Sequence, residues 1–276
     1  MAKGRKKKFK GHKLVVKSNA LVQTSRTTLG LAEMRAFSFF LAQINEPSAA
    51  KIVAGGEVEL TFNKAEFCEM CGIEKGNGGN NRYLKETIKR LSQSTFEIER
   101  GIEGQPGYKW EVMTVLNYAA LETMPETNET LTVTFNRRIV PYLFNLKSNF
   151  TTYQLGNVME LKSKHAFRLY EFFKSFNTRT ITLYFGKIQK LLGVKYESAY
   201  ELIRKVVEPA LKDINRKTDL YISFEKIYTN GAITSIMFLI TPHSEMVEVK
   251  EADVEIDDVG NNFVVYEDVE QLKLDI

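Results

Sequence analysis

The sequence has few of the residues that build metal or redox sites. Only two cysteines, Cys68 and Cys71, and three histidines occur among its 276 residues. A structural zinc site usually needs four ligands, and no second cysteine pair or nearby histidine accompanies the segment "KAEFCEMCGI". No βαβ pattern surrounds the two cysteines, which disfavours a thioredoxin-like redox site. We therefore predict buried free thiols on a helix, no metal and no cofactor.

Long apolar runs are also missing. No stretch approaches the ~20 apolar residues that cross a membrane, and Lys17 interrupts the apolar patch that follows the basic N-terminus. We predict neither a membrane span nor a secretory signal, and expect a cytoplasmic protein. The hydrophobic content of 43% and the charged content of 26% are typical of a soluble globular chain. The length allows two ordinary domains or one large one.

Catalytic signatures are scarce as well. His12, His165 and His243 lie far apart, so the His-x-His pair of DNA-nicking enzymes is missing. The Gly-rich segment "GNGGNN" (76–81) lacks the following Gly-Lys-Ser/Thr of a phosphate-binding loop, which argues against an ATPase. No Ser/His/Asp cluster stands out. We predict a binding protein rather than an enzyme, and we assign His165 a structural role.

Charge is strongly segregated along the chain. The net charge of +4 combines eight basic and no acidic residues in 1–17 with eleven acidic residues and two lysines in 245–276. We interpret both ends as solvated tails. The basic stretch "GRKKKFKGHK" is either a solubilising arm or a sequence-independent contact to nucleic-acid phosphates.

The segment between the tails carries one order of elements twice, offset by roughly 120 residues. The order is helix, strand, helix, turn, helix and hairpin. In the first copy the segments are 30–44, 58–62, 63–73, 81–93 and 95–116. In the second they are 163–176, 181–185, 186–194, 196–217 and 218–240, with a turn at Asn230-Gly231. A strand and a helix within 131–146 complete the first copy.

This order is that of a winged helix, in which the last helix enters the major groove of DNA. We therefore predict an α+β fold with two tandem winged-helix domains. The expected divisions are a basic tail, an N-terminal winged helix for dimerisation and auxiliary DNA contact, a C-terminal winged helix as the main DNA reader, and an acidic tail. Their boundaries are 1–17, 18–152, 153–244 and 245–276.

The last helix of the second copy contains a proline. Its apolar residues recur every three or four positions and form one stripe, while Arg204 and Lys205 belong to the polar side. Pro209 removes the hydrogen bond to the Lys205 carbonyl, which costs ~3 kcal/mol in a helix interior. We interpret Pro209 as a bend that keeps the first half of the helix in the groove and returns the second half to the core.

Three stretches in order resemble a known family. They are "VVKSNALVQTSRTTLGLAEMRAF", "LKSKHAFRLYEFFKSF" and "VVEPALKDINRKTDLYISFEKI". Over roughly residues 14–240 the chain is similar to the initiator replication proteins of theta-replicating, iteron-type plasmids. The resemblance implies two winged-helix domains, monomers that bind direct repeats (iterons) at a plasmid origin, and dimers that repress their own promoter.

The resemblance also implies which residues contact DNA. The helix 196–217 would be the main sequence reader, with Arg204 as the first candidate for guanine readout. Lys205 would read guanine or hold a phosphate, and Glu201 would accept from a cytosine amino group or pair with Lys205. Tyr196 and Ser198 would lie near the groove floor or the backbone.

A second set of residues is expected to contact phosphates, which position the protein without specifying sequence. In the second domain these are Lys187, Lys190, Lys226, Tyr228 and Asn230. In the first domain, the helix 81–93 presents Arg82, Glu86, Lys89 and Arg90 outward, with Arg82 and Lys89 as the phosphate candidates; the alternative is a solvated charged face.

We therefore expect an initiator that binds iterons, strains the DNA and helps an adjacent A·T-rich segment to open. Its partners would be double-stranded DNA, a second copy of the chain, and the host helicase and initiator proteins. The C-terminal "QLKLDI" resembles a sliding-clamp docking motif, in which Gln271, Leu272, Leu274 and Ile276 would fill the pocket. The alternative is an acidic tail that repels non-specific DNA contacts.

Two other functions fit the same pattern. A winged-helix transcriptional repressor with no role in initiation is the principal alternative, and a segregation or architectural DNA-binding protein is a third. An initiator's gene lies beside several direct repeats of ~20 bp, whereas a repressor's operator is an inverted repeat.

Overall fold

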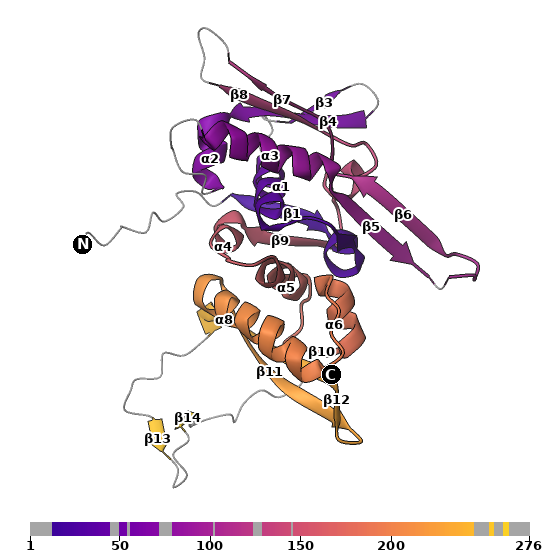
Figure 1. Ribbon diagram of the computed structural model, residues 1–276, viewed down its shortest axis with the longest axis vertical. Helices are drawn as coiled ribbons and strands as arrows, with labels where there is room; N and C mark the ends of the chain where they lie inside the picture. Colours follow the sequence, from indigo (N-terminus) through magenta and orange to yellow (C-terminus); the bar gives the residue numbers. More distant parts are fainter. Residues whose placement is uncertain are drawn as a thin grey trace.

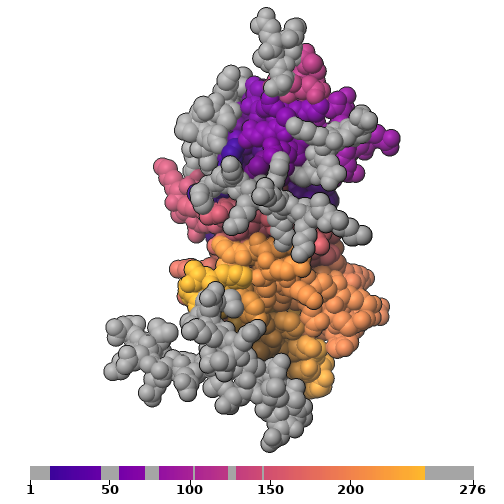
Figure 2. All heavy atoms as spheres, turned by 90° about the vertical axis from the view of Figure 1, so that its left-hand side faces the viewer, coloured from indigo at the N-terminus to yellow at the C-terminus, as the bar shows by residue number. Residues whose placement is uncertain are grey.

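The computed structural model describes residues 13–44, 50–53, 56–71, 79–101, 103–123, 129–144, 146–245, 254–256 and 262–264. Two winged-helix units are stacked along its long axis, as Figure 1 shows. Figure 2 shows the same two lobes from the side, with the second unit in orange below the first. The tandem α+β winged-helix prediction is therefore confirmed.

In the described ranges, the α-helices of the first unit are α1 (Leu31–Ile44), α2 (Lys64–Met70) and α3 (Gly79–Gln93), and a short π-helix spans Ala20–Thr24. Its hairpin consists of β5 (Thr95–Arg100) and β6 (Lys109–Thr114), and β2 (Arg26–Thr27) pairs with the other edge of β5. A separate antiparallel sheet has the order β3 (Ala50–Val53), β4 (Glu57–Asn63), β8 (Thr130–Phe135), β7 (Leu116–Glu122). The chain thus continues from β6 directly into a second sheet.

The second unit is the shorter and simpler of the two. Its helices are α5 (Lys164–Lys174), α6 (Phe185–Leu192), α7 (Ala199–Leu202) and α8 (Glu208–Lys217). Its sheet has the order β10 (Thr180–Tyr184), β12 (Ala232–Pro242), β11 (Leu220–Thr229). Asn230 and Gly231 join β11 to β12 with φ angles of 51° and 76°, so the predicted two-residue turn is confirmed.

The segment Ala199–Lys217, which we call the reading helix, is not a uniform α-helix. A π-helical turn at Ile203–Val207 separates α7 from α8, and the Glu208 amide bonds back to the Ile203 carbonyl. The buried residues Leu202, Val206, Ala210 and Ile214 are spaced by four. Four α-helical residues turn by about 400°, so such a stripe drifts by about 40° at each step. The wider π-turn corrects this drift, and it precedes Pro209, whose missing N–H and ring disfavour the ordinary α-helical bond.

Helix α5 joins the two units. It packs against α8 and α6 on one side and against α1 and β9 (Phe150–Gln154) on the other. Phe167, Tyr170, Phe172 and Phe173 of α5 are almost fully buried. They belong to one hydrophobic cluster that extends from α1 to β12. The two units therefore share a core.

A buried ionic cluster fastens α5 to the start of the chain. The Lys17 ammonium and the Tyr153 hydroxyl both donate to the Glu171 carboxylate, while Arg168 donates to the carbonyls of Leu21 and Ser25. Lys17, Arg168 and Glu171 are at most 6% exposed. Burial lowers the pKa of Lys17, and the Glu171 charge opposes that shift. The cluster holds β1 (Leu14–Ser18), which pairs with β9, against α5.

Some expectations need correction. Residues 14–17, assigned to a solvated basic tail, form β1, because Val15 is apolar and Lys17 has a buried counter-ion in Glu171. The helix expected within 131–146 is a single 3₁₀ turn at Val140–Tyr142. Pro141 is in the first turn of this helix, where it prevents extension toward the N-terminus.

The other sequence-level assignments have mixed outcomes. Cys68 is buried in α2 and Cys71, directly after it, is half-buried, and both are free thiols whose pKa is raised by burial. His165 is half-buried, and this burial is the main cause of its lowered pKa. Residues 1–12 lie outside the described part. In the acidic tail, the described residues form β13 (Val254–Ile256) and β14 (Asn262–Val264), which pair with each other.

Candidate nucleic-acid interface

The first half of the reading helix presents a charged face. Arg204 and Lys205 are exposed, because the neighbouring Leu202, Ile203 and Val206 face the core. The Lys205 ammonium lies 2.7 Å from the Glu201 carboxylate, and this contact lowers the pKa of Glu201. In the described part of the chain, the Arg204 guanidinium has no ion-pair partner. Of the two roles expected for Glu201, the structure therefore shows the ion pair with Lys205. Arg204 stays available to bind a ligand.

Two predicted contact residues at the start of this helix have structural roles. Ser198 is the N-cap of α7, and its hydroxyl accepts a 3.4 Å hydrogen bond from the Glu201 amide. Tyr196 is half-buried against the core, and its amide donates to the Gln189 side chain. The Ser198 hydroxyl keeps its own proton for donation, since it acts as an acceptor in the cap.

The hairpin β11–β12 meets the reading helix through a cation–π contact. The Lys226 ammonium lies 5.6 Å from the centre of the Tyr200 ring. Tyr228 is 60% exposed near the hairpin end, and Asn230 is exposed in the turn. The structure thus brings Tyr200, Lys226 and Arg204 onto adjoining elements. Sequence reasoning missed Tyr200, although its position one residue before Glu201 on the polar side was a usable signal.

Helix α6 contributes two lysines and a neighbouring tyrosine. Partial burial, and then the charge of Lys190, lower the pKa of Lys187. A bound phosphate would relieve this repulsion. Lys190 itself is 2.9 Å from the Glu99 carboxylate of the first unit, so this predicted phosphate contact already has an anionic partner. Tyr184, which precedes α6 and is 72% exposed, was not predicted.

In the first unit, α3 carries a stripe of exposed cations. Arg82, Lys85 and Lys89 are spaced by three and four residues and have no ion-pair partner in the described ranges. Arg90 differs from them, because its Nε donates to the buried Glu33 carboxylate at 2.6 Å. The stripe therefore includes Arg82 and Lys89 as predicted and adds Lys85, while Arg90 anchors α3 to α1.

A second basic site in the first unit was missed. Exposed Arg137 and Arg138 line a hollow of about 670 Å³ with Lys109, Tyr142 and Glu111, whose carboxylate pairs with Lys109 at 2.9 Å. The turn that carries them is fixed, because the Asn136 side chain accepts from the Arg138 amide at 2.9 Å and donates to Thr114 at 2.8 Å. The adjacent arginines in "FNRRIV" were the available signal. This hollow has the charge and the fixed backbone to bind a phosphate group.

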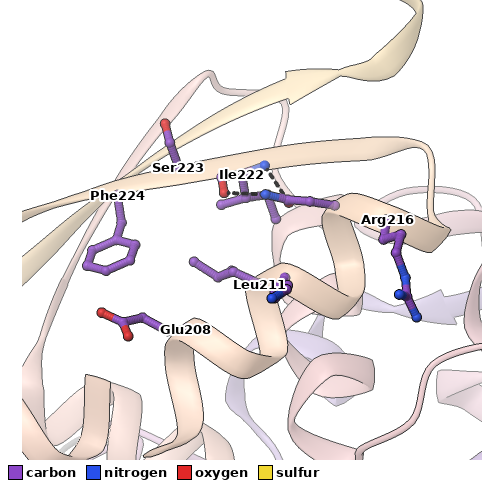
Figure 3. Close-up of a pocket in the computed structure, with 8 residues that line it drawn as sticks. Glu208, Leu211, Arg216, Ile222, Ser223 and Phe224 are labelled. Carbon is purple, nitrogen blue, oxygen red and sulfur yellow. Dashed lines mark hydrogen bonds between the residues drawn. The ribbon is translucent and has the colours of Figure 1, made fainter. Parts of the chain in front are cut away.

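The groove in Figure 3 lies elsewhere, between α8 and β11. It measures about 550 Å³, and Glu208, Leu211 and Phe224 are among the residues that line it. Asn215 closes one end, because its side chain both donates to the Ile222 carbonyl and accepts from the Ile222 amide. None of the predicted DNA contacts lines this groove, so it belongs to the packing of the second unit.

The described residues contain neither a metal-binding cluster nor a membrane-spanning helix. No group of three or more His, Cys, Asp or Glu side chains in the described ranges is placed to hold a metal ion. None of the helices there is both long and apolar enough for a membrane span. The clamp-motif residues Gln271, Leu272, Leu274 and Ile276 lie outside the described part.

Both winged-helix units match models of a known protein family. The model "Initiator Replication protein, WH1" matches residues 14–174, and the model "Initiator Rep protein, WH2" matches residues 185–240. The chain belongs to the initiator replication protein family. In this chain the first match ends with α5 and the second begins with α6, at Phe185.

Individual relatives agree with the family assignment. A replication initiation protein of Escherichia coli is 26% identical over 178 residues, which cover 61% of this chain and 52% of the relative. An uncharacterized 27.6 kDa protein of Escherichia coli is 32% identical over 92 residues, or 32% of this chain and 38% of the relative. The chain thus spans about half or less of the length of these curated relatives.

A solved structure shares the fold of this chain. The Pi initiator protein, whose crystal structure is in complex with iteron DNA, has a TM-score of 0.64 and 18% sequence identity. The similarity covers 84% of this chain and 98% of the Pi chain. At this identity the likeness supports the tandem winged-helix fold.

Proposed function

We propose that this chain is a plasmid replication initiator, and that it binds the direct repeats of its origin while they are double-stranded DNA. The observation that carries the proposal is the match of both initiator winged-helix models, over 14–174 and 185–240, together with a surface that contains exposed Arg204 and Tyr200 and half-buried Lys226. Arg204 would read a guanine in the major groove. Lys187, Lys226, Tyr228 and Asn230 would hold phosphates around it.

The first winged helix would supply an auxiliary DNA contact and the dimer interface. Arg82, Lys85 and Lys89 on α3 support the DNA contact, since they form one unpaired basic stripe among the described residues. We retain 18–152 and 153–244 as the working division of the two domains. With α5 in the second domain, each domain contains one full helix–strand–helix–helix–hairpin set.

The chain would act without chemistry of its own. Several monomers on neighbouring repeats would bend the DNA and favour opening of an adjacent A·T-rich segment. The host helicase and initiator proteins, and the sliding clamp through residues 271–276, are the proposed protein partners. The cytoplasm is the proposed location.

Footprinting of the purified protein on DNA flanking its gene tests the function. We expect protected blocks on several direct repeats in regular phase, weakening as salt rises because phosphate contacts release counterions. Protection of a single inverted repeat alone would instead identify a repressor. No protection of any repeat, with DNA bound only at random, would refute the proposal.

A further inference from the structure

The hairpin β5–β6 has two chemically different faces. Residues opposite each other in an antiparallel pair point to the same side of the sheet. The register places Arg100 beside Lys109, and Ile98 beside Glu111, on the side that includes the core residues Phe96 and Met113. The other side has an acidic and aromatic character. It contains Glu97 beside Val112, Glu99 beside Trp110, and Arg26 of β2 beside Glu97.

The acidic side is organised by specific contacts. The Trp110 indole donates to the Glu97 carboxylate at 2.8 Å, and the Tyr108 hydroxyl donates to Glu99 at 3.4 Å. Arg26 lies 3.8 Å from Glu97 and 3.7 Å from Glu99. A surface with two carboxylates and one arginine does not suit a DNA phosphate. The hairpin therefore differs from a winged-helix wing that lies along the backbone.

This side meets the second domain at Lys190. The Lys190 ammonium donates to the Glu99 carboxylate at 2.9 Å, between residues 91 positions apart in the chain. Lys190 is on α6, the helix that precedes the reading helix, where a winged helix contacts the DNA backbone. The Glu99 carboxylate neutralises the Lys190 charge and repels a phosphate that approaches it, so the two anions compete for this ammonium.

We propose that Glu99 is a positioning residue, which holds Lys190 of α6 against the first domain's hairpin and competes with DNA phosphate for it. This inference rests on the proposed function, because it requires α6 to approach DNA. The Glu99–Lys190 contact links the hairpin to α6 in the free protein. Binding of DNA transfers Lys190 from the carboxylate to a phosphate and releases the hairpin.

The exposure of the pair suits an exchangeable contact. The side chains of Lys190 and Glu99 are 44% and 30% exposed. An ion pair in contact with water is weak and is screened by salt, so a phosphate of higher charge density can displace it. The buried Lys17–Glu171 pair, at 5% and 2% exposed, is of the opposite kind. Of these two ion pairs, the Lys190–Glu99 contact is the one that a phosphate from solution can reach.

The binding test uses Glu99→Gln, Lys190→Gln and the double variant in the full chain. Dissociation constants are measured on an iteron duplex and on a random duplex over a salt series. Glu99→Gln should tighten binding to both duplexes by about two- to five-fold at low salt, because the competitor for Lys190 is removed. Lys190→Gln should weaken binding to both. In the Lys190→Gln background, Glu99→Gln should have no further effect.

Glu103→Gln is the matched control. Glu103 lies in the loop of the hairpin whose first strand carries Glu99. It is exposed and makes no ion pair in the described ranges. It tests whether any lost negative charge on the hairpin tightens binding. If Glu103→Gln gives the same gain as Glu99→Gln, or if the Glu99→Gln gain persists without Lys190, the competition is refuted.

Carbodiimide crosslinking tests the contact without relying on DNA affinity. The reagent couples a lysine to a carboxylate in direct contact, and mass spectrometry should find Glu99 joined to Lys190 in the free protein. Saturating iteron DNA should reduce the yield of this product. Absence of the product in the free protein, or an unchanged yield with bound DNA, would overturn the inference. If the protein binds no repeat at all, the proposed function fails, whereas the crosslink still reports whether the contact exists.

Discussion

The two hairpins occupy equivalent places in the two winged helices but have different surroundings. Hairpin β5–β6 and its loop carry four glutamates against two cations, and Glu99 reaches the neighbouring domain. Hairpin β11–β12 carries one glutamate and one lysine, and exposes Tyr228 and Asn230 near its end. One hairpin therefore contacts the protein itself, while the other is available to a nucleic acid. The comparison teaches that a duplicated fold does not duplicate a binding surface.

Strand pairing separates the two units in the same way. In the second unit, β10 joins the hairpin sheet beside β12. In the first, the corresponding β4 pairs with β3 and β8 instead, and the hairpin pairs with β2. The first unit thereby gains a four-stranded sheet and the turn that carries Arg137 and Arg138. Its extra strands enlarge the surface of the first unit.

The largest effect is expected from a change in the buried ionic cluster around Glu171, which fastens α5 to the start of the chain. Glu171→Gln leaves Lys17 and Arg168 buried without their anion, so the free energy of unfolding should fall by about 3–5 kcal/mol. Urea denaturation followed by circular dichroism measures this change. Glu160→Gln, at an exposed position after α4 (Leu155–Met159), is the control and should have little effect. A loss of the same size in the control would show that the buried charge is not the cause.

The next prediction separates reading from positioning. Arg204→Ala should cost ~1–3 kcal/mol of binding free energy on the correct repeat and relax the preference at one base pair. Arg82→Ala in the first unit should weaken binding to all duplexes by a similar factor, because a phosphate contact has no sequence preference. Binding to a panel of repeats with single base changes measures both. Equal losses from Arg204→Ala on correct and random DNA would contradict base readout at this residue.

A third prediction concerns the π-turn, which the reading helix has and α3 lacks. Pro209→Ala restores an N–H that can bond to the Lys205 carbonyl, so the turn can revert to an α-helix and rotate Arg204 relative to the core. We expect affinity for the repeat to fall by about 1 kcal/mol, a smaller loss than that from the Arg204 change. Anisotropy titration and thermal unfolding measure the two consequences. Unchanged affinity in a more stable protein would show that Pro209 does not shape the DNA-binding face.

The smallest effect is expected in the basic hollow of the first unit. Arg137→Gln should reduce the steepness of the salt dependence by about 0.9 per lost phosphate contact, with a modest and uniform loss of affinity. The measurement is the slope of log K against log salt on one duplex. Lys212→Gln, on the exposed side of α8, is a matched control. An unchanged slope for Arg137→Gln would assign the hollow to something other than DNA.

The sequence predicted elements where local chemistry determines them. The apolar periodicity placed α1, α3 and α5 within a few residues, and Asn230-Gly231 fixed the second hairpin. It failed where long-range contacts decide. Lys17 looked like part of a solvated tail because its counter-ion, Glu171, is 154 residues away.

The candidate site was predictable only in part. Exposure of Arg204 and Lys205 follows from helical periodicity, which the sequence contains. The pairing of Lys190 with Glu99 does not, since no sequence pattern relates α6 to a hairpin of another domain. The π-turn was also hidden, because a four-residue spacing and a proline are equally compatible with a bend. The pairing of Lys190 with Glu99 depends on how the two domains meet, and the π-turn depends on packing within the second domain.

Helix α5 has a practical consequence for engineering. Anyone who exchanges the second domain to change which origin is recognised must choose a side of this helix for the junction. A cut before Lys164 would remove the partner of Lys17 and leave the apolar surfaces of α1 and β9 uncovered. A cut in the exposed segment 177–180 keeps the contacts of that helix with α1, β9 and Lys17, and the incoming domain then has to supply the surface that α6 and α8 provide here. Chimeras joined there should remain soluble when those joined earlier aggregate.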